Sequence, residues 1–219
     1  MAKTKFKMCG LHSLEDVETA MGSRADYLGF VFAESKRKVT AGQVKSWIET
    51  AEKGNKELVA LFVNPSIKEI EAVLNEVPID IIQLHGTESG SFLKTVQQRT
   101  GCLVWKALHH GEETVSQLKE FKEADGIVID ARVKGAWGGT GTSFDWEAVP
   151  FYKQAGCEYN LPLFIAGGIN KDNIAELLTF SPYGVDISSG TEREGKKDPA
   201  IIQEIEKRLE THERNVSRS

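Results

Sequence analysis

Two residues that could exchange protons with a substrate end separate apolar runs of the sequence. The run "FKMCG" carries Cys9 near its end, and the run "GIVID" ends on Asp130. A cysteine acts as a base only as a thiolate, and an aspartic acid donates a proton near neutral pH only where burial or negative neighbours raise its pKa. We therefore expect surroundings that help Cys9 to ionise. If the fold brings both ends to one site, they offer a base and an acid to different atoms of one substrate.

Eight short apolar runs alternate with charged stretches of helical spacing, which is typical of βα units around a parallel sheet. The predicted strands are 6–8, 27–32, 58–63, 79–84, 103–107, 126–129, 162–166 and 185–188. The predicted helices are 13–21, 40–53, 66–76, 88–99, 113–122, 145–155, 170–178 and 199–209. Eight units of about 27 residues favour a single-domain (β/α)8 TIM barrel, an α/β fold, with a doubly wound open sheet as the rival.

A barrel also predicts where to look for chemistry, because its active site forms at the C-terminal ends of the strands. Arg37 follows the second strand, in "AESKR", and His85 follows the fourth, where it either contacts the substrate or orients a loop. Asp186, inside the last strand, either points into the barrel near the site or forms a hydrogen bond in the core. His109 and His110 follow the fifth strand. Because adjacent residues of an extended chain point to opposite sides, we expect solvent exposure for this pair rather than a metal site.

Two turns rich in small residues follow the last two predicted strands. "IAGGIN" contains Gly167 and Gly168, and "ISSGTE" contains Ser189 and Gly190. Barrels commonly bind a phosphate at this position, where backbone amides and the start of a short helix point at the anion. The sequence therefore predicts a phosphate site between these turns.

The loop that follows Asp130, "ARVKGAWGGTGTSF" at 131–144, is the longest predicted βα loop. Long loops inside compact domains are usually functional lids or binding loops. Its four glycines would let it close over a ligand, which Trp137 could cover.

Composition narrows the classes of partner. The chain has 219 residues, 40% of them hydrophobic, enough for one domain over 1–219 with a polar tail from about 210 to 219. Its net charge of -5 comes from interspersed acids and bases, so we expect no nucleic acid and no membrane as partner. No stretch resembles a signal peptide or a membrane span, which favours a cytoplasmic protein. Three widely spaced cysteines predict free thiols and no metal. We expect a phosphorylated small molecule as substrate, and a monomer or homodimer.

The motifs "KMCG", "GFVF" followed by "SKR", "IIQLHG", "GGTGTSFDW", "IAGGIN" and "GVDISSGTE" occur in this order over residues 7–198. In this combination they resemble the phosphoribosylanthranilate isomerase family of tryptophan biosynthesis. The resemblance implies a barrel that needs no cofactor and catalyses the third pathway-specific step, an Amadori rearrangement. In it N-(5-phosphoribosyl)anthranilate, an aminoaldose, becomes 1-(2-carboxyphenylamino)-1-deoxyribulose 5-phosphate, an aminoketose.

The resemblance also implies roles for single residues. Cys9 would be the general base, Asp130 the general acid, and Arg37 the ligand of the anthranilate carboxylate. Lys36 departs from the family pattern, which usually has a proline before that arginine. The residue types suit the reaction independently, since opening the furanose needs a proton on the ring oxygen and the resulting Schiff-base cation makes the C2 proton acidic.

Two other readings compete with this one. Another phosphate-binding barrel enzyme, a ribulose-phosphate epimerase or an aminoimidazole-ribotide isomerase, would use paired acids, metal ligands or an aspartate on the first strand, and Cys9 argues against it. A catalytically silent barrel that senses a phosphorylated metabolite would be expected to have lost Cys9 or Asp130, and both are present.

Overall fold

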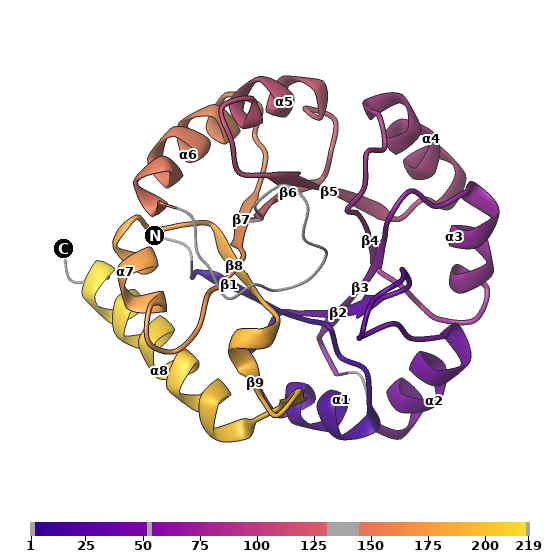
Figure 1. Cartoon of the computed structure of the whole chain (residues 1–219), viewed down its shortest axis with the longest axis horizontal. Helices are drawn as coiled ribbons and strands as arrows, with labels where there is room; N and C mark the ends of the chain where they lie inside the picture. Colours follow the sequence, from indigo (N-terminus) through magenta and orange to yellow (C-terminus); the bar gives the residue numbers. More distant parts are fainter. Residues whose placement is uncertain (1–2, 52–53, 131–144, 218–219) are drawn as a thin grey trace.

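The eight apolar runs form parallel strands that close into a barrel surrounded by helices (Figure 1). The computed structural model describes residues 3–51, 54–130 and 145–217. The barrel strands are β1 (Lys5–Cys9), β2 (Tyr27–Val31), β3 (Glu57–Phe62), β4 (Ile81–Leu84), β5 (Leu103–His109), β6 (Gly126–Asp130), β7 (Leu163–Ala166) and β8 (Gly184–Ile187). Consecutive strands pair, and β8 pairs with β1. This closure confirms the predicted TIM barrel and excludes an open sheet, whose two edge strands would lack a partner.

Helices follow the strands in sequence and lie around the ring in the same order (Figure 1). They are α1 (Leu14–Met21), α2 (Ala41–Ala51), α3 (Ile67–Leu74), α4 (Gly90–Thr100), α5 (Thr114–Glu120), α6 (Val149–Glu158), α7 (Ile174–Thr179) and α8 (Pro199–Val216). Short 3-10 turns η1 (Trp146–Ala148) and η2 (Ser189–Thr191) precede α6 and follow β8. Within the described ranges, no helix is both long and apolar enough to span a membrane.

Alternate strand residues fill the barrel, as the pleat of a strand requires. The inner cluster consists of Tyr27, Val59, Ile81, Trp105, Ala107, Val128, Phe164 and Ala166. Trp105 stacks on Phe164 with ring centroids 4.6 Å apart, and Tyr27 meets both rings edge-on. The aromatic side chains fill the barrel interior, so the substrate site must lie above them at the strand ends.

Local sequence sets several helix boundaries. The Ser66 hydroxyl accepts a hydrogen bond from the backbone amide of Glu69, and the Glu69 carboxylate accepts one from the backbone amide of Ser66. This reciprocal pair fixes the start of α3. Ser89 caps α4, and Gly101 ends it in the left-handed conformation that glycine adopts without strain.

The last helix is longer than predicted. We expected a helix over 199–209 and a polar tail from about 210, but α8 runs to Val216. Arg24 explains the extension, because its guanidinium binds Glu213 at 2.6 Å and its backbone amide donates to Glu206 at 2.6 Å. The last turns of α8 are thus held by a tertiary ion pair between Glu213 and Arg24.

Two further differences concern the segments beside the predicted phosphate site. Helix α7 begins at Ile174 rather than 170, because the Asn170 side chain accepts the amides of Asp172 and Asn173 and forms a turn in place of helix. A small hairpin of β9 (Glu192–Arg193) and β10 (Lys196–Lys197) follows η2 and was not predicted. The two residues of its turn, Glu194 and Gly195, both have positive φ, as tight hairpin turns require.

Candidate active site

The register of the barrel decides which polar side chains face inward. Neighbouring Cα partners share one face of a sheet, and Lys7 is the partner of Tyr27, a member of the inner cluster. Cys9, two residues later, faces the same way. Asp130 and Asp186 are both partners of the inner residue Ala166. These four side chains therefore all point into the C-terminal half of the barrel.

Cys9 is the last residue of β1, and only 7% of its surface is exposed. Burial raises the pKa of the Cys9 thiol above its ordinary value, and the charges of Lys7 and, more weakly, Lys197 oppose this rise only in part. The expectation that the surroundings would make Cys9 more acidic is therefore wrong for the described residues. Two cations, Lys7 and Lys197, lie close to the thiol at the end of β1.

Asp130, the last residue of β6, is 8% exposed and lies beside His85, the residue after β4. His85 Nε2 and Asp130 Oδ2 are 3.3 Å apart, within ion-pair distance, but Nε2 forms no hydrogen bond among the described residues. On the other side of the ring, Gln83 Nε2 lies 3.1 Å from His85 Nδ1. The ring of His85 therefore lies between the Gln83 amide on one side and the Asp130 carboxylate on the other. His85 thus orients toward the predicted acid, while substrate contact stays a prediction.

His109, the last residue of β5, and His110, the residue after it, have different surroundings, as expected of adjacent residues in an extended chain. His109 is exposed, is the Cα partner of Asp130, and has its ring 6.3 Å from that of His85. His110 is half-buried and its Nδ1 lies 2.7 Å from the Tyr152 hydroxyl, so the prediction of solvent exposure is wrong for His110. Within the described ranges, no three His, Cys, Asp or Glu side chains group as metal ligands.

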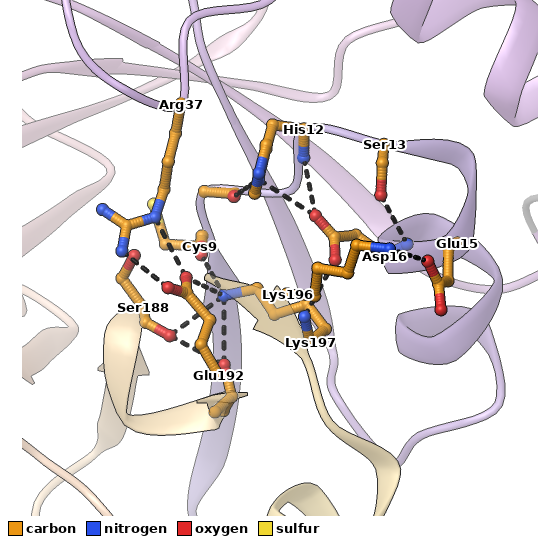
Figure 2. A network of polar contacts seen from close by, with 12 residues as sticks. Cys9, His12, Ser13, Glu15, Asp16, Arg37, Ser188, Glu192, Lys196 and Lys197 are labelled. Atoms are coloured by element: carbon orange, nitrogen blue, oxygen red, sulfur yellow. Dashed lines mark hydrogen bonds and ion pairs between the residues drawn. The ribbon is translucent and has the colours of Figure 1, made fainter. Parts of the chain in front are cut away.

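Arg37 reaches the same mouth from the loop after β2, where its aliphatic stem lies against Gly10. Its Nε donates to Glu192 Oε1 at 3.0 Å and its Nη2 to Glu192 Oε2 at 2.7 Å, a bidentate pair across one edge of the guanidinium (Figure 2). The Nη1 end of the group lies outside this pair. Lys36 is exposed, and Ser35 accepts the amide of Arg37 at 2.9 Å, so the turn forms without the family's usual proline.

Glu192 is in turn held by Lys197, which is fully buried and comes from β10 (Figure 2). The Lys197 ammonium donates to four oxygens within 3.0 Å, which belong to Glu192, Thr191 and the carbonyls of Cys9 and Ser188. Lys197 therefore joins the ends of β1 and β8 to the hairpin. Glu192 lies between two cations. Burial alone would raise the pKa of its carboxyl group, but hydrogen bonds from Arg37 and the charge of Lys197 outweigh burial and lower it.

The two small-residue turns lie against each other beside these groups. Gly167 and Gly168 have φ of 87° and 66°, values that side-chain-bearing residues rarely adopt. A Cβ on Gly190 would collide with the carbonyl oxygen of Ile169, so only glycine permits this approach. Ser189, in the same turn, is exposed. The structure brings these predicted residues together at the ends of β7 and β8.

Comparisons with known proteins give the same picture. Residues 6–208 match the family model described as N-(5'phosphoribosyl)anthranilate (PRA) isomerase. The N-(5'-phosphoribosyl)anthranilate isomerase of Geobacillus thermodenitrificans is 47% identical over 213 residues, which cover 97% of this chain and 96% of that protein. The chain belongs to the N-(5'-phosphoribosyl)anthranilate isomerase family. It is accordingly an isomerase that catalyses the Amadori step of tryptophan biosynthesis.

Solved structures of phosphoribosylanthranilate isomerases share the fold. The Thermotoga maritima enzyme superposes with a TM-score of 0.83 at 30% identity, covering 95% of this chain and 99% of that one. The name of another solved structure of the Thermotoga maritima enzyme calls that enzyme dimeric. A phosphoribosylanthranilate isomerase in complex with reduced 1-(o-carboxyphenylamino)-1-deoxyribulose 5-phosphate has a TM-score of 0.79 at 28% identity, with coverage of 95% and 99%.

Sequence reasoning missed four polar residues of this isomerase that support the predicted ones: Lys7, Gln83, Glu192 and Lys197. Lys7 carried a usable signal, since a lysine inside the apolar run "FKM" is unusual in a strand covered on both faces. Glu192 and Lys197 carried no such signal, because their roles depend on the short β9–β10 hairpin, which the pattern of apolar residues does not predict. The predicted closing loop, 131–144 with Trp137, lies outside the described residues.

Proposed function

We propose that Cys9 removes the C2 proton of phosphoribosylanthranilate and that Asp130 protonates its ring oxygen. The observation that carries this assignment is their placement. Both are nearly buried, both face inward, and both end strands at the C-terminal side of the barrel, with β7 and β8 between their strands. An acid and a base so separated can act on different atoms of one substrate.

The acid opens the sugar. When Asp130 gives its proton to the ring oxygen, the C1–O bond breaks with its electron pair going to oxygen, and the nitrogen lone pair forms a C1=N iminium ion. The His85 Nε2–H, 3.3 Å from Asp130 Oδ2, can then stabilise the carboxylate that remains.

The base completes the rearrangement. The Cys9 thiolate takes the C2 proton, the C–H electron pair becomes a C1=C2 double bond, and the iminium electrons return to nitrogen. Loss of the C2 hydroxyl proton and protonation of C1 then give the aminoketose. Every step moves protons within one substrate with no net oxidation, so we propose no metal and no cofactor.

Two further contacts would hold the substrate. We assign the anthranilate carboxylate to Arg37, whose Nη1 end lies outside its pair with Glu192 and can meet a second carboxylate. We assign the phosphate to the backbone of Gly167, Gly168, Ser189 and Gly190, because glycines with positive φ allow close backbone approach to an anion. His85 is assigned to the substrate side of the site, next to the acid.

The wider setting is also a proposal. A phosphorylated small molecule is the partner we assign, with no nucleic acid and no membrane, and a cytoplasmic location suits an enzyme of a water-soluble metabolite. We propose a monomer or a homodimer, for which the dimeric Thermotoga maritima relative offers a precedent.

The assignment is tested by following the fluorescence of freshly made phosphoribosylanthranilate. Cys9→Ala and Asp130→Asn should each lower kcat by at least about 100-fold, the scale of removing a general base or acid. Both should still bind the stable reduced product analogue. Cys102→Ala is the control, since Cys102 lies before β5 at the opposite end of the barrel. A folded Cys9→Ala protein with near-normal turnover would show that another group is the base.

A further inference from the structure

A buried ion pair lies directly beneath Cys9. Lys7 Nζ donates to Asp186 Oδ2 at 2.7 Å, and the two side chains are 0% and 7% exposed. Asp186 Oδ1 has no hydrogen-bond partner among the described residues. The pair joins β1 to β8 inside the barrel, where the neighbouring inward residues are mostly apolar.

Stability alone is a poor explanation for this pair. Removing two charges from water costs several kcal/mol per ion, and buried pairs can often be replaced by apolar residues without loss. The other six strands fill the same interior with aliphatic and aromatic residues. A lysine and an aspartate at these positions therefore suggest a role in the site.

The lysine is close to the Cys9 sulfur. Lys7 and Cys9 are two residues apart on β1, so their side chains point the same way. A Cβ built on Gly29, the Cα partner of Cys9, would lie 3.0 Å from Cys9 Sγ and 3.3 Å from Lys7 Nζ. Both groups thus border the small volume that Gly29 leaves open. Glycine on β2 allows the ammonium and the sulfur to approach each other.

We infer that Lys7 is a positioning residue that stabilises the thiolate of Cys9, while Asp186 anchors its ammonium. The inference rests on the proposed role of Cys9 as the base. Asp186 fixes the ammonium on one side and leaves its remaining N–H groups for the sulfur. The base is thereby supported from within the barrel, on the side away from the substrate.

The charges around Cys9 agree with this role. Burial raises the pKa of the Cys9 thiol, and the Lys7 ammonium is the largest opposing influence. Asp186 also raises the pKa of the Cys9 thiol, whereas Lys197 lowers it. The Arg37 guanidinium interacts electrostatically with Cys9 as well. Lys7 keeps its own charge, because burial lowers its pKa but the charges of Asp186 and Cys9 more than compensate. The ammonium is therefore present at neutral pH, when the base must act.

The test measures the thiol directly, in a Cys102→Ser/Cys157→Ser background where Cys9 is the only cysteine. Thiolate absorbance in the ultraviolet is followed against pH, with a Cys9→Ser protein as blank, and the iodoacetamide reaction rate is measured at pH 7.5. In Lys7→Met the titration should move to higher pH and the alkylation rate should fall about tenfold or more, since a cation within a few ångströms of a thiolate has effects of this size. Lys106→Met is the matched control, because Lys106 is equally buried and paired with Glu88 at 2.9 Å but lies on the outer face of β5.

Two more variants keep the inference testable if Lys7→Met folds poorly. Lys7→Met/Asp186→Asn removes both charges and should still titrate at higher pH than the background. Gly29→Ala keeps every charge but places a methyl group between sulfur and ammonium, and it should shift the titration in the same direction. A Lys7→Met or double-variant protein that titrates like the background would overturn the inference.

Activity separates this inference from the proposed function. If Cys9 is the base, Lys7→Met should lower kcat at neutral pH with little change in KM, and kcat should recover as the pH rises. A purely structural role would not produce recovery at high pH. If Cys9→Ala remained active while Lys7→Met still shifted the thiol titration, the base assignment would fail and the Lys7–Cys9 coupling would stand.

Discussion

Replacing Arg37 by alanine tests how the enzyme recognises the anthranilate carboxylate. Glu192 occupies the Nε–Nη2 edge of the guanidinium at 3.0 and 2.7 Å, so the contact that we propose with the substrate carboxylate would use the Nη1 end. The Arg37 side chain is 26% exposed, which places this contact in a partly closed site. Loss of a charge-assisted contact there should cost about 1.5 to 3 kcal/mol, or roughly ten- to a hundredfold in kcat/KM.

Glu192 adds a second effect that the structure makes measurable. In Arg37→Ala its carboxylate stays at the mouth, still held by Lys197 at 3.0 Å, and repels the substrate carboxylate. Arg37→Ala/Glu192→Gln removes that repulsion and should recover part of the loss, so the two substitutions should be non-additive. Arg37→Lys should not restore activity, because an ammonium cannot bridge two carboxylates with a planar fork.

The assay compares two substrates by initial rates. Phosphoribosylanthranilate carries the carboxylate, and a phosphoribosylaniline analogue lacks it. Arg37→Ala should penalise the first far more than the second, and only the first should respond to the added Glu192→Gln change. An equal loss for both substrates would refute the reasoning, since Arg37 would then act on something other than the carboxylate.

Three other expectations follow from the contacts. Lys197→Met removes a buried cation from four acceptors and should lower the free energy of unfolding by about 3 to 5 kcal/mol in urea titrations, whereas a loss below about 1 kcal/mol would contradict its role. Gly190→Val should abolish competitive inhibition by inorganic phosphate, while Ser189→Ala should change it little; retained inhibition in Gly190→Val would move the phosphate elsewhere. Burial lowers the pKa of His110 in the folded protein, so the unfolded chain takes up a proton first as the pH falls. The stability that His110 contributes above pH 6.5 is therefore lost as the pH falls below this value. Melting temperatures at pH 8 and pH 5 should differ less in His110→Phe than in the parent protein, and an equal difference would exclude this source.

The sequence was sufficient to predict the barrel and the positions of the residues at its mouth. Closure follows from eight similar βα units, and a βα barrel places every strand end on one face. Cys9 and Asp130 end such strands, so their common location needed no knowledge of long-range contacts. The same reasoning placed Arg37 at this face, and the structure brings it there.

The partners of these residues could not be predicted in the same way. Arg37 and Glu192 are 155 residues apart, and Lys7 and Asp186 are 179 apart. Nothing in local periodicity says which cation meets which carboxylate once the barrel closes. The error at Cys9 has the same origin, because the extent of its burial depends on packing by strands distant in sequence.

Helix ends show a related limit. The periodic pattern of α8 fades after 209, yet Glu213 keeps the helix ordered through an ion pair with Arg24. The start of α7 was misplaced because the side chain of Asn170 competes with helix formation. In both cases a specific polar contact overrides the pattern of apolar residues.

The division of labour between Cys9 and Asp130 is tested most directly by the kinetic isotope effect with substrate deuterated at C2. If Cys9 removes the C2 proton, Cys9→Ala makes that step rate-limiting, and turnover of the deuterated substrate should be clearly slower than that of the ordinary one. If Asp130 only opens the ring, Asp130→Asn makes ring opening rate-limiting, and both substrates should then react at the same rate. The reverse pattern, an isotope effect in Asp130→Asn and none in Cys9→Ala, would contradict the assignment of the base and the acid.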